Sequence, residues 1–78
     1  MSKGLSLLEK VVSKILRREN ISLSMNMVAP DIEGWDSLNH VQIIFTIEQE
    51  LGVKFAVHEI QNLNSIGDLV QLIDKYNN

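Results

Sequence analysis

Apolar residues recur three or four positions apart along several segments of this 78-residue chain, whereas apolar and polar residues alternate only in one short run, residues 21–27. The first spacing is that of an amphipathic helix, whereas a half-buried strand would alternate. A chain of this length holds one small domain with a thin core. The sequence therefore predicts an all-α fold, a four-helix bundle occupying residues 1–78 as a single domain.

The helix boundaries follow from capping residues and from the ends of each periodic segment. The first helix is expected over about residues 5–18, and the third, which is short, over about residues 56–62. Asp36 caps the second helix, Ser37 is its first residue and Gly52 ends it. Ser65 opens the fourth helix in a capping box with Asp68. The long loop before Asp36 contains apolar residues, including Trp35, that we expect to anchor it to the bundle.

Composition excludes several kinds of site and location. There is no cysteine, so disulfides and thiolate metal ligands are excluded, and we predict no metal site. The apolar runs are far shorter than the roughly 20 residues that span a bilayer, and the N-terminus lacks a signal-peptide pattern. A cytoplasmic monomer without a membrane span is expected.

Charge is unevenly distributed along the chain. Net charge is −3, and residues 31–59 hold six acidic side chains against Lys54 alone. Such a surface repels nucleic acid and attracts a basic protein patch, although charges of this kind also simply keep a small domain soluble. We therefore expect protein partners and no nucleic acid.

The stretch Gly34-Trp35-Asp36-Ser37-Leu38 places a serine at the start of a helix, beside free backbone N–H groups. A phosphodiester attached to Ser37 would lie at the positive end of the helix dipole. The alternative is that Asp-Ser is simply an ordinary helix start. A Ser37-His40-Asp36 catalytic triad is rejected, because residues three apart on one helix cannot orient a base that a third group must hold. We predict no catalytic residue and no enzyme; a solvent-exposed His40, or one near a phosphate on Ser37, is expected instead.

Asp36-Ser37-Leu38, followed by an amphipathic helix ending at Leu51-Gly52, resembles the acyl carrier protein family. The long first loop, the position of Phe55 and the last two helices also fall where that family has them, so the resemblance spans the whole chain. It implies that Ser37 carries 4'-phosphopantetheine, transferred from coenzyme A, and that Asp36 and Leu38 belong to the site read by a phosphopantetheinyl transferase. An acyl-activating or acyl-transferring enzyme and condensing or modifying enzymes are implied as further partners.

The resemblance also implies two surfaces. One is a partner-docking stripe on the second helix, formed by Leu38, Val41, Phe45 and Glu48. The other is a space between the helices that takes the acyl chain, lined by Ile44, Ile47, Phe55, Ile60, Leu63 and Ile66. For each of these apolar residues, plain core packing is the alternative.

Two departures from the family pattern concern partner choice. Asn39 and Gln42 stand where carriers of fatty acid synthesis commonly have acids, and the third helix is poor in acid. These differences predict a specialised carrier, dedicated to one pathway and one activating enzyme, rather than service to a housekeeping fatty acid synthase. Within that prediction, a fatty-acyl carrier of lipid metabolism and a polyketide-type carrier both stay open. An aminoacyl carrier and an unloaded helical interaction module of a larger assembly remain alternatives.

Overall fold

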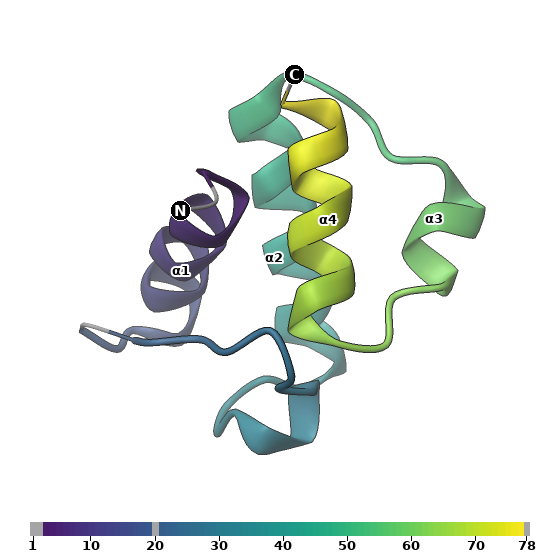
Figure 1. Ribbon diagram of the computed structural model, residues 1–78. Helices are drawn as coiled ribbons and strands as arrows, with labels where there is room; N and C mark the ends of the chain where they lie inside the picture. The colour runs from purple at the N-terminus through teal and green to yellow at the C-terminus, as the bar shows by residue number, and fades with distance from the viewer. Residues whose placement is uncertain (1–2, 20, 78) are drawn as a thin grey trace.

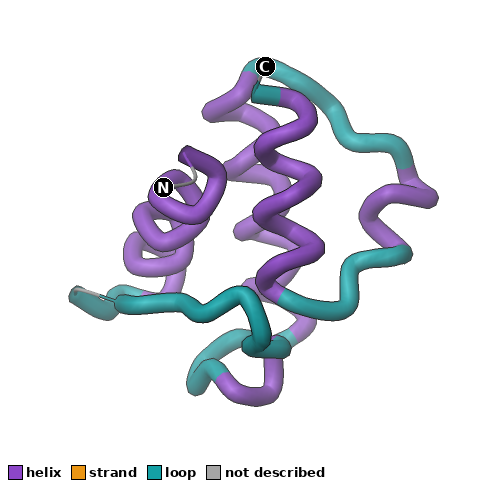
Figure 2. Tube along the Cα trace, viewed as in Figure 1, coloured by secondary structure: helices purple, strands orange, loops and turns teal. Residues whose placement is uncertain are grey.

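The computed structural model describes residues 3–19 and 21–77, which form four α-helices and one short 3-10 helix. Their order is α1 (Lys3–Leu16), η1 (Ala29–Asp31), α2 (Ser37–Leu51), α3 (Val57–Gln61) and α4 (Ile66–Tyr76). Figure 1 shows α1 and α2 beside α4, with α3 standing on the opposite side of α4 from α1. No strand occurs among the described residues (Figure 2), so the predicted all-α fold with a short third helix is confirmed.

The ends of α1 and α2 show how single residues stop a helix. Gly52 has a φ of 67° and ends α2, as predicted. The helix α1 begins and ends two residues earlier than expected. It ends at Leu16 because Arg17 adopts a left-handed conformation with a φ of 56°. The N–H of Arg18 then donates to the carbonyl of Ser13 at 3.0 Å, which closes the helix end.

The long loop between α1 and α2 is attached to the first turn of α4. The backbone N–H of Ile66 donates to the carbonyl of Met27 at 2.8 Å, and that of Gly67 donates to the carbonyl of Met25 at 2.9 Å. A Cβ added to Gly67 would lie 3.0 Å from the Met25 oxygen, so glycine permits this close approach. The loop therefore supplies acceptors to a helix N-terminus that would otherwise lack them.

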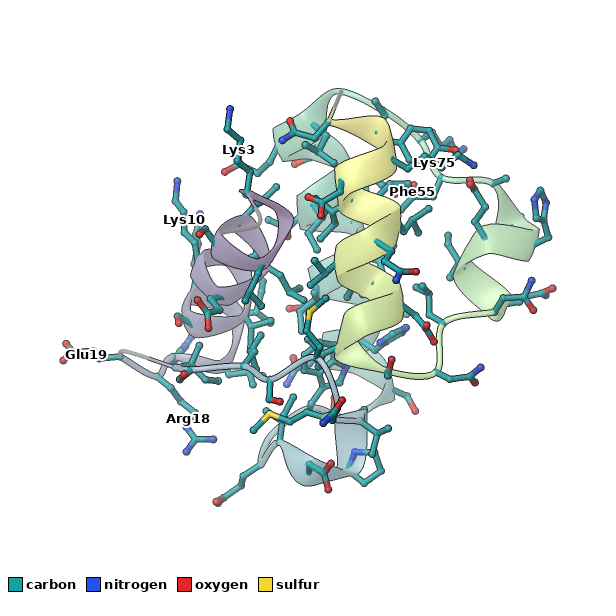
Figure 3. The ribbon with its side chains drawn as sticks, in the orientation of Figure 1. Lys3, Lys10, Arg18, Glu19, Phe55 and Lys75 are labelled. Carbon is teal, nitrogen blue, oxygen red and sulfur yellow. The ribbon has the colours of Figure 1, made fainter. Side chains whose placement is uncertain are left out.

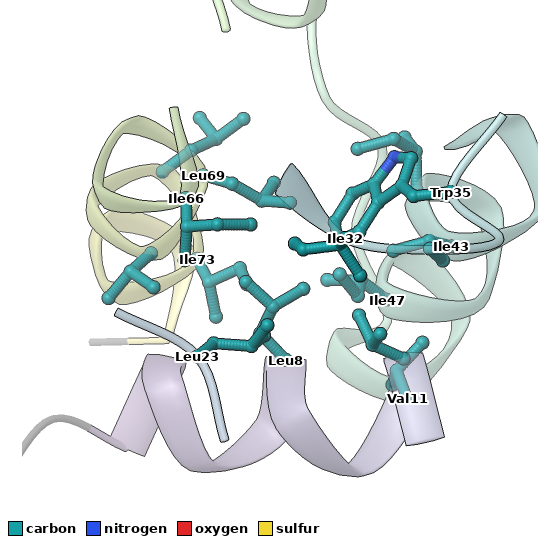
Figure 4. Packing of buried hydrophobic residues seen from close by; sticks show 14 of the residues in the cluster. Leu8, Val11, Leu23, Ile32, Trp35, Ile43, Ile47, Ile66, Leu69 and Ile73 are labelled. Carbon is teal, nitrogen blue, oxygen red and sulfur yellow. The ribbon is translucent and has the colours of Figure 1, made fainter. Parts of the chain in front are cut away.

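The core draws on three helices and the loop (Figure 4). Ile32 and Trp35 of the loop point into the space between α2 and α4, which confirms that the loop is anchored by apolar residues. On α2 the buried face includes Ile43, which is fully buried, whereas Val41 is 64% exposed. The buried residues are Leu8, Val11, Val12, Leu23, Ile32, Trp35, Ile43, Ile44, Ile47, Phe55, Ile66, Leu69, Val70, Leu72 and Ile73.

Polar contacts of Glu59 hold the five-residue helix α3 to the end of α4. Its carboxylate accepts from the backbone N–H of Ala56 at 3.0 Å, from the Lys75 ammonium at 2.8 Å and from the Tyr76 hydroxyl. The Tyr76 ring packs against Phe55 with 5.1 Å between ring centroids, and Figure 3 places Lys75 and Phe55 close together on this side of α4. Hydrogen bonds from Lys75, then Tyr76 and Ala56, lower the pKa of Glu59 from 4.5 to about 2.

This cluster predicts acid sensitivity at the contact between α3 and α4. A carboxylate whose pKa is lowered by folding stabilises the protein fully above its unfolded pKa, and that stabilisation disappears as the pH falls towards the folded pKa. Glu59→Gln should therefore lower the urea midpoint at pH 6, and the difference from the wild type should vanish between pH 4.5 and about 2.

The matched control is Glu50→Gln. Glu50 meets Lys10 at 3.9 Å with both side chains largely exposed, so it should leave the urea midpoint almost unchanged at every pH. A difference between Glu59→Gln and wild type that stays constant down to pH 2 would contradict the assignment.

Candidate functional site

Ser37 is the first residue of α2, and its side chain is exposed. The preceding Asp36 caps the helix, as predicted, by accepting the N–H of Asn39 at 2.8 Å. The backbone N–H groups of Ser37 and Leu38 have no acceptor within the described part of the chain. The Ser37 hydroxyl thus stands beside two free donors at the positive end of a 15-residue helix.

A tight turn at Gly34 fixes the direction in which α2 starts. Gly34 has a φ of 92°, a conformation that other residues rarely adopt. Its carbonyl accepts from the N–H of Asp36 at 3.1 Å and from the side-chain amide of Asn39 at 2.7 Å. Asn39 therefore ties the first turn of α2 back to this turn, a contact that needs an amide donor and that a carboxylate could not make.

The turn also brings the Trp35 indole onto α2. Trp35 is 8% exposed, and its Nε1–H donates to Nδ1 of His40 at 3.0 Å. His40 is half-buried, so the expected exposed histidine is wrong, while a His40 near a phosphate on Ser37 stays a prediction. Because its Nδ1 accepts from Trp35 while Asp36 accepts from Asn39, His40 is not oriented by Asp36, and the rejection of a catalytic triad agrees with this geometry.

An open groove of about 540 Å³ lies directly beside Ser37. Its lining is mostly apolar, formed by Ala29, Trp35, Asp36, Ser37, His40 and Val41. A flexible chain attached to the Ser37 hydroxyl would have the helix N-terminus for its phosphate and this groove for its remainder. The residues present therefore fit a covalent phosphopantetheine arm.

The stripe predicted for partner docking divides into an exposed apolar part and an internal acid. Leu38 is 67%, Val41 64% and Phe45 57% exposed, so one face of α2 carries three large apolar side chains in solvent. Glu48 instead is half-buried, and its carboxylate accepts from the backbone N–H of Phe55 at 2.7 Å. It holds the loop after α2 in place.

The residues predicted to line an acyl pocket lie in the packed interior. Ile44, Ile47, Phe55 and Ile66 are buried core residues, while Ile60 and Leu63 are half-buried and pack against them. Leu63 also lines a small cavity of about 50 Å³, together with Ala29, Trp35, His40, Asn64, Ser65 and Leu69. Sequence reasoning missed Ala29 as a site residue, because it lies in the loop outside the Asp-Ser-Leu motif, and it considered His40 without its bond to Trp35.

Other kinds of site find no support in the described residues. No group of three or more histidine or acidic side chains is placed to hold a metal ion within residues 3–19 and 21–77. No described helix is both long and apolar enough to cross a membrane.

Comparisons with known proteins agree with this geometry. The family model for the phosphopantetheine attachment site matches residues 6–73. The chain is similar to a holo acyl carrier protein from Geobacter metallireducens, at 36% identity and a TM-score of 0.85, over 94% of this chain and 84% of that chain. It is also similar to a candidate acyl carrier protein from Mycobacterium tuberculosis, at 25% identity and a TM-score of 0.81, over 94% and 97% of the two chains.

The contact between Asn39 and Gly34 predicts how the helix start responds to charge. Asn39→Asp removes the amide donor and places a carboxylate oxygen near the Gly34 carbonyl, so we expect a loss of about 1 kcal/mol in the free energy of unfolding. Gln42→Glu, an equally acidic change at an exposed position of the same helix, should stay within about 0.5 kcal/mol of wild type. Urea unfolding of both variants is the measurement; equal stability would show that the amide contact contributes nothing.

Proposed function

The chain belongs to the family of phosphopantetheine attachment domains, and on that premise we propose that Ser37 is its attachment residue. Its function is that of an acyl carrier, a non-catalytic protein that works with phosphopantetheinyl transferase and partner enzymes. The bound 4'-phosphopantetheine supplies a thiol that holds acyl groups as thioesters. This chain would contribute the Ser37 hydroxyl, to which the phosphopantetheine arm is attached.

The observation that supports Ser37 is its place one residue inside the helix. Ser65 also stands at a helix start, but as the N-cap of α4, where its Oγ accepts the N–H of Asp68 at 3.2 Å. At α2 the capping role falls to Asp36, so the Ser37 hydroxyl makes no hydrogen bond with the described residues and is exposed. A serine in that position can be modified without loss of the cap.

Intact mass measurement tests the attachment site. After incubation with coenzyme A and a broad-specificity transferase, the wild type should gain one phosphopantetheine and Ser37→Ala none. Ser24→Ala, which changes an exposed serine of the loop, is the control and should be modified like wild type. Modification of Ser37→Ala would refute the assignment, and an unmodified wild type would favour an unloaded interaction module.

For partner recognition we infer that the exposed apolar stripe of Leu38, Val41 and Phe45 is the docking surface. Interface anchors are typically large apolar or aromatic side chains, and these three stand in solvent on the helix that begins at Ser37. Four of the six acids of the 31–59 segment accept backbone N–H groups instead: Asp31 from Val28, Asp36 from Asn39, Glu48 from Phe55 and Glu59 from Ala56. Docking would therefore depend mainly on apolar contact.

The predominance of apolar over charged contacts expected on α2 supports a role in a specialised pathway rather than in housekeeping fatty acid synthesis. Exposed charges chiefly set association rate and its salt dependence. With uncharged Asn39 and Gln42 beside the stripe, partners with strongly basic docking patches would gain little from this helix. We expect dedicated loading and condensing or modifying enzymes with apolar docking sites.

Truncation of the stripe tests the docking surface. Phe45→Ala should lower kcat/KM for modification by the transferase about tenfold, since an interface anchor contributes at least about 1.4 kcal/mol. The control is Val57→Ala, which removes a side chain of similar exposure, 69%, from α3. It should leave kcat/KM unchanged within about twofold, and both variants should unfold like wild type. Equal losses in the two variants would argue against α2 as the specific surface.

A further inference from the structure

The imidazole of His40 has one nitrogen engaged in a hydrogen bond and one nitrogen free. Its Nδ1 accepts the indole N–H of Trp35 at 3.0 Å, with 6.0 Å between the two ring centroids. A neutral imidazole that accepts at Nδ1 carries its proton on Nε2, which is then a donor. No residue in the described ranges 3–19 and 21–77 accepts a hydrogen bond from this nitrogen. His40 therefore has a donor available for a bound group.

His40 lies one helical turn after Ser37, on the same side of α2. Residues three apart on a helix are neighbours, with about 5–6 Å between their Cβ atoms. Helical side chains lean towards the N-terminus of the helix, and the bond from His40 back to Trp35 agrees with that direction. Both Ser37 and His40 line the open groove of about 540 Å³. A phosphate on the Ser37 hydroxyl would therefore come within reach of the His40 ring.

The other side chains that line this groove offer a phosphate no donor. Ala29 and Val41 are apolar, and the indole N–H of Trp35 is already bonded to His40. Asp36 is an acid, and the described residues place no lysine or arginine in the lining. A phosphodiester is an anion, and hydrogen bonds to an anion are stronger than those between neutral groups. The His40 N–H would thus add to the free backbone N–H groups at the start of α2.

We propose that His40 binds the phosphate of the arm, with Trp35 holding its imidazole so that the Nε2–H donates to a phosphodiester oxygen on Ser37. Trp35 is 8% exposed, and its own backbone N–H donates to the carbonyl of Ile32 at 3.2 Å. The imidazole is therefore held by a fixed neighbour and loses little freedom when it binds the phosphate. The arm would then leave Ser37 along the groove. This inference rests on the proposed attachment at Ser37.

Magnetic resonance of the apo protein tests how Trp35 holds the imidazole. In nitrogen-labelled protein at pH 8, long-range correlations from the ring C–H protons identify which imidazole nitrogen carries the proton. We expect it on Nε2 of His40. The Trp35 indole proton should also exchange with water more slowly than in His40→Leu, where it has no acceptor. The exposed His58 of α3 supplies the chemical shifts of an unrestrained ring. A proton on Nδ1 of His40 would overturn the proposal.

Loading with the arm tests the contact with the phosphate. Wild type, His40→Leu and the control His58→Leu are incubated with coenzyme A and a broad-specificity transferase, and intact mass verifies the loading. The phosphorus resonance should differ between wild type and His40→Leu and should be the same in His58→Leu as in wild type. The rise in thermal midpoint from apo to holo should be about 4 °C larger in wild type than in His40→Leu, as expected for one modest hydrogen bond to a charged group in a small domain.

Two further variants separate the donor from the ring. His40→Gln keeps an N–H donor on a side chain of similar reach, so its midpoint rise on loading should stay close to that of wild type. Trp35→Phe keeps His40 but removes the indole donor, so its midpoint rise should fall towards that of His40→Leu. Both variants also keep the test decisive should His40→Leu fail to fold. A rise in Trp35→Phe equal to that in wild type would overturn the role given to Trp35.

The outcomes separate this inference from the function on which it rests. A wild type that gains no mass would overturn the attachment at Ser37 and the role of His40 with it. A loaded wild type whose midpoint rise and phosphorus resonance match those of His40→Leu would overturn the role of His40 alone. The backbone N–H groups at the start of α2 would then hold the phosphate without it.

Discussion

The attachment of the first loop to the N-terminus of α4 is the contact on which the rest of the molecule depends. Two backbone N–H groups of α4, those of Ile66 and Gly67, need acceptors, and the carbonyls of Met27 and Met25 supply them. With the loop fixed there, Ile32 and Trp35 reach the core between α2 and α4. A chain this small has few apolar residues to bury, and a free loop would remove these from the core. The same anchoring sets the turn at Gly34, and hence where Ser37 stands.

At the turn formed by Gly34, different residues make the hydrogen bonds that the start of α2 needs. Asp36 satisfies the N–H of Asn39, and the Asn39 side chain satisfies the carbonyl of Gly34. The Trp35 side chain is buried, and its indole N–H donates a hydrogen bond to His40. Because Asp36 and Asn39 make these capping contacts, the Ser37 hydroxyl is not needed for them. A residue that must take a bulky covalent group needs this freedom, since modification of a capping hydroxyl would compete with the cap.

Helical periodicity and capping residues predicted most of this architecture, because burial of an apolar face and capping are local effects. The bounds of α2 followed from Asp36 and Gly52, and the opening of α4 from Ser65 and Asp68. Periodicity missed two kinds of feature. On α2 apolar side chains occupy more than one face, and only the positions of α1 and α4 decide that Ile43 is buried while Val41 is exposed. The bond from Phe55 to Glu48, the Trp35–His40 bond and the end of α1 at Arg17 are local, but they depend on the conformation of the chain just outside a helix, which apolar spacing does not reveal.

The placement of the acids changes what the charge pattern means for recognition. A run of six acids against one lysine in residues 31–59 suggests an electrostatic surface, yet Asp31, Asp36, Glu48 and Glu59 each accept backbone N–H groups. A carboxylate bound in this way keeps its charge and a second oxygen that can accept from a partner's lysine or arginine, as Glu59 does from Ala56 and Lys75 at once, but its side chain is held in one position. The three apolar residues on the exposed face of α2 lie in solvent and are not engaged in hydrogen bonds of this kind. Long-range attraction can therefore still bring a basic partner near, while the contact that holds it would be made by Leu38, Val41 and Phe45.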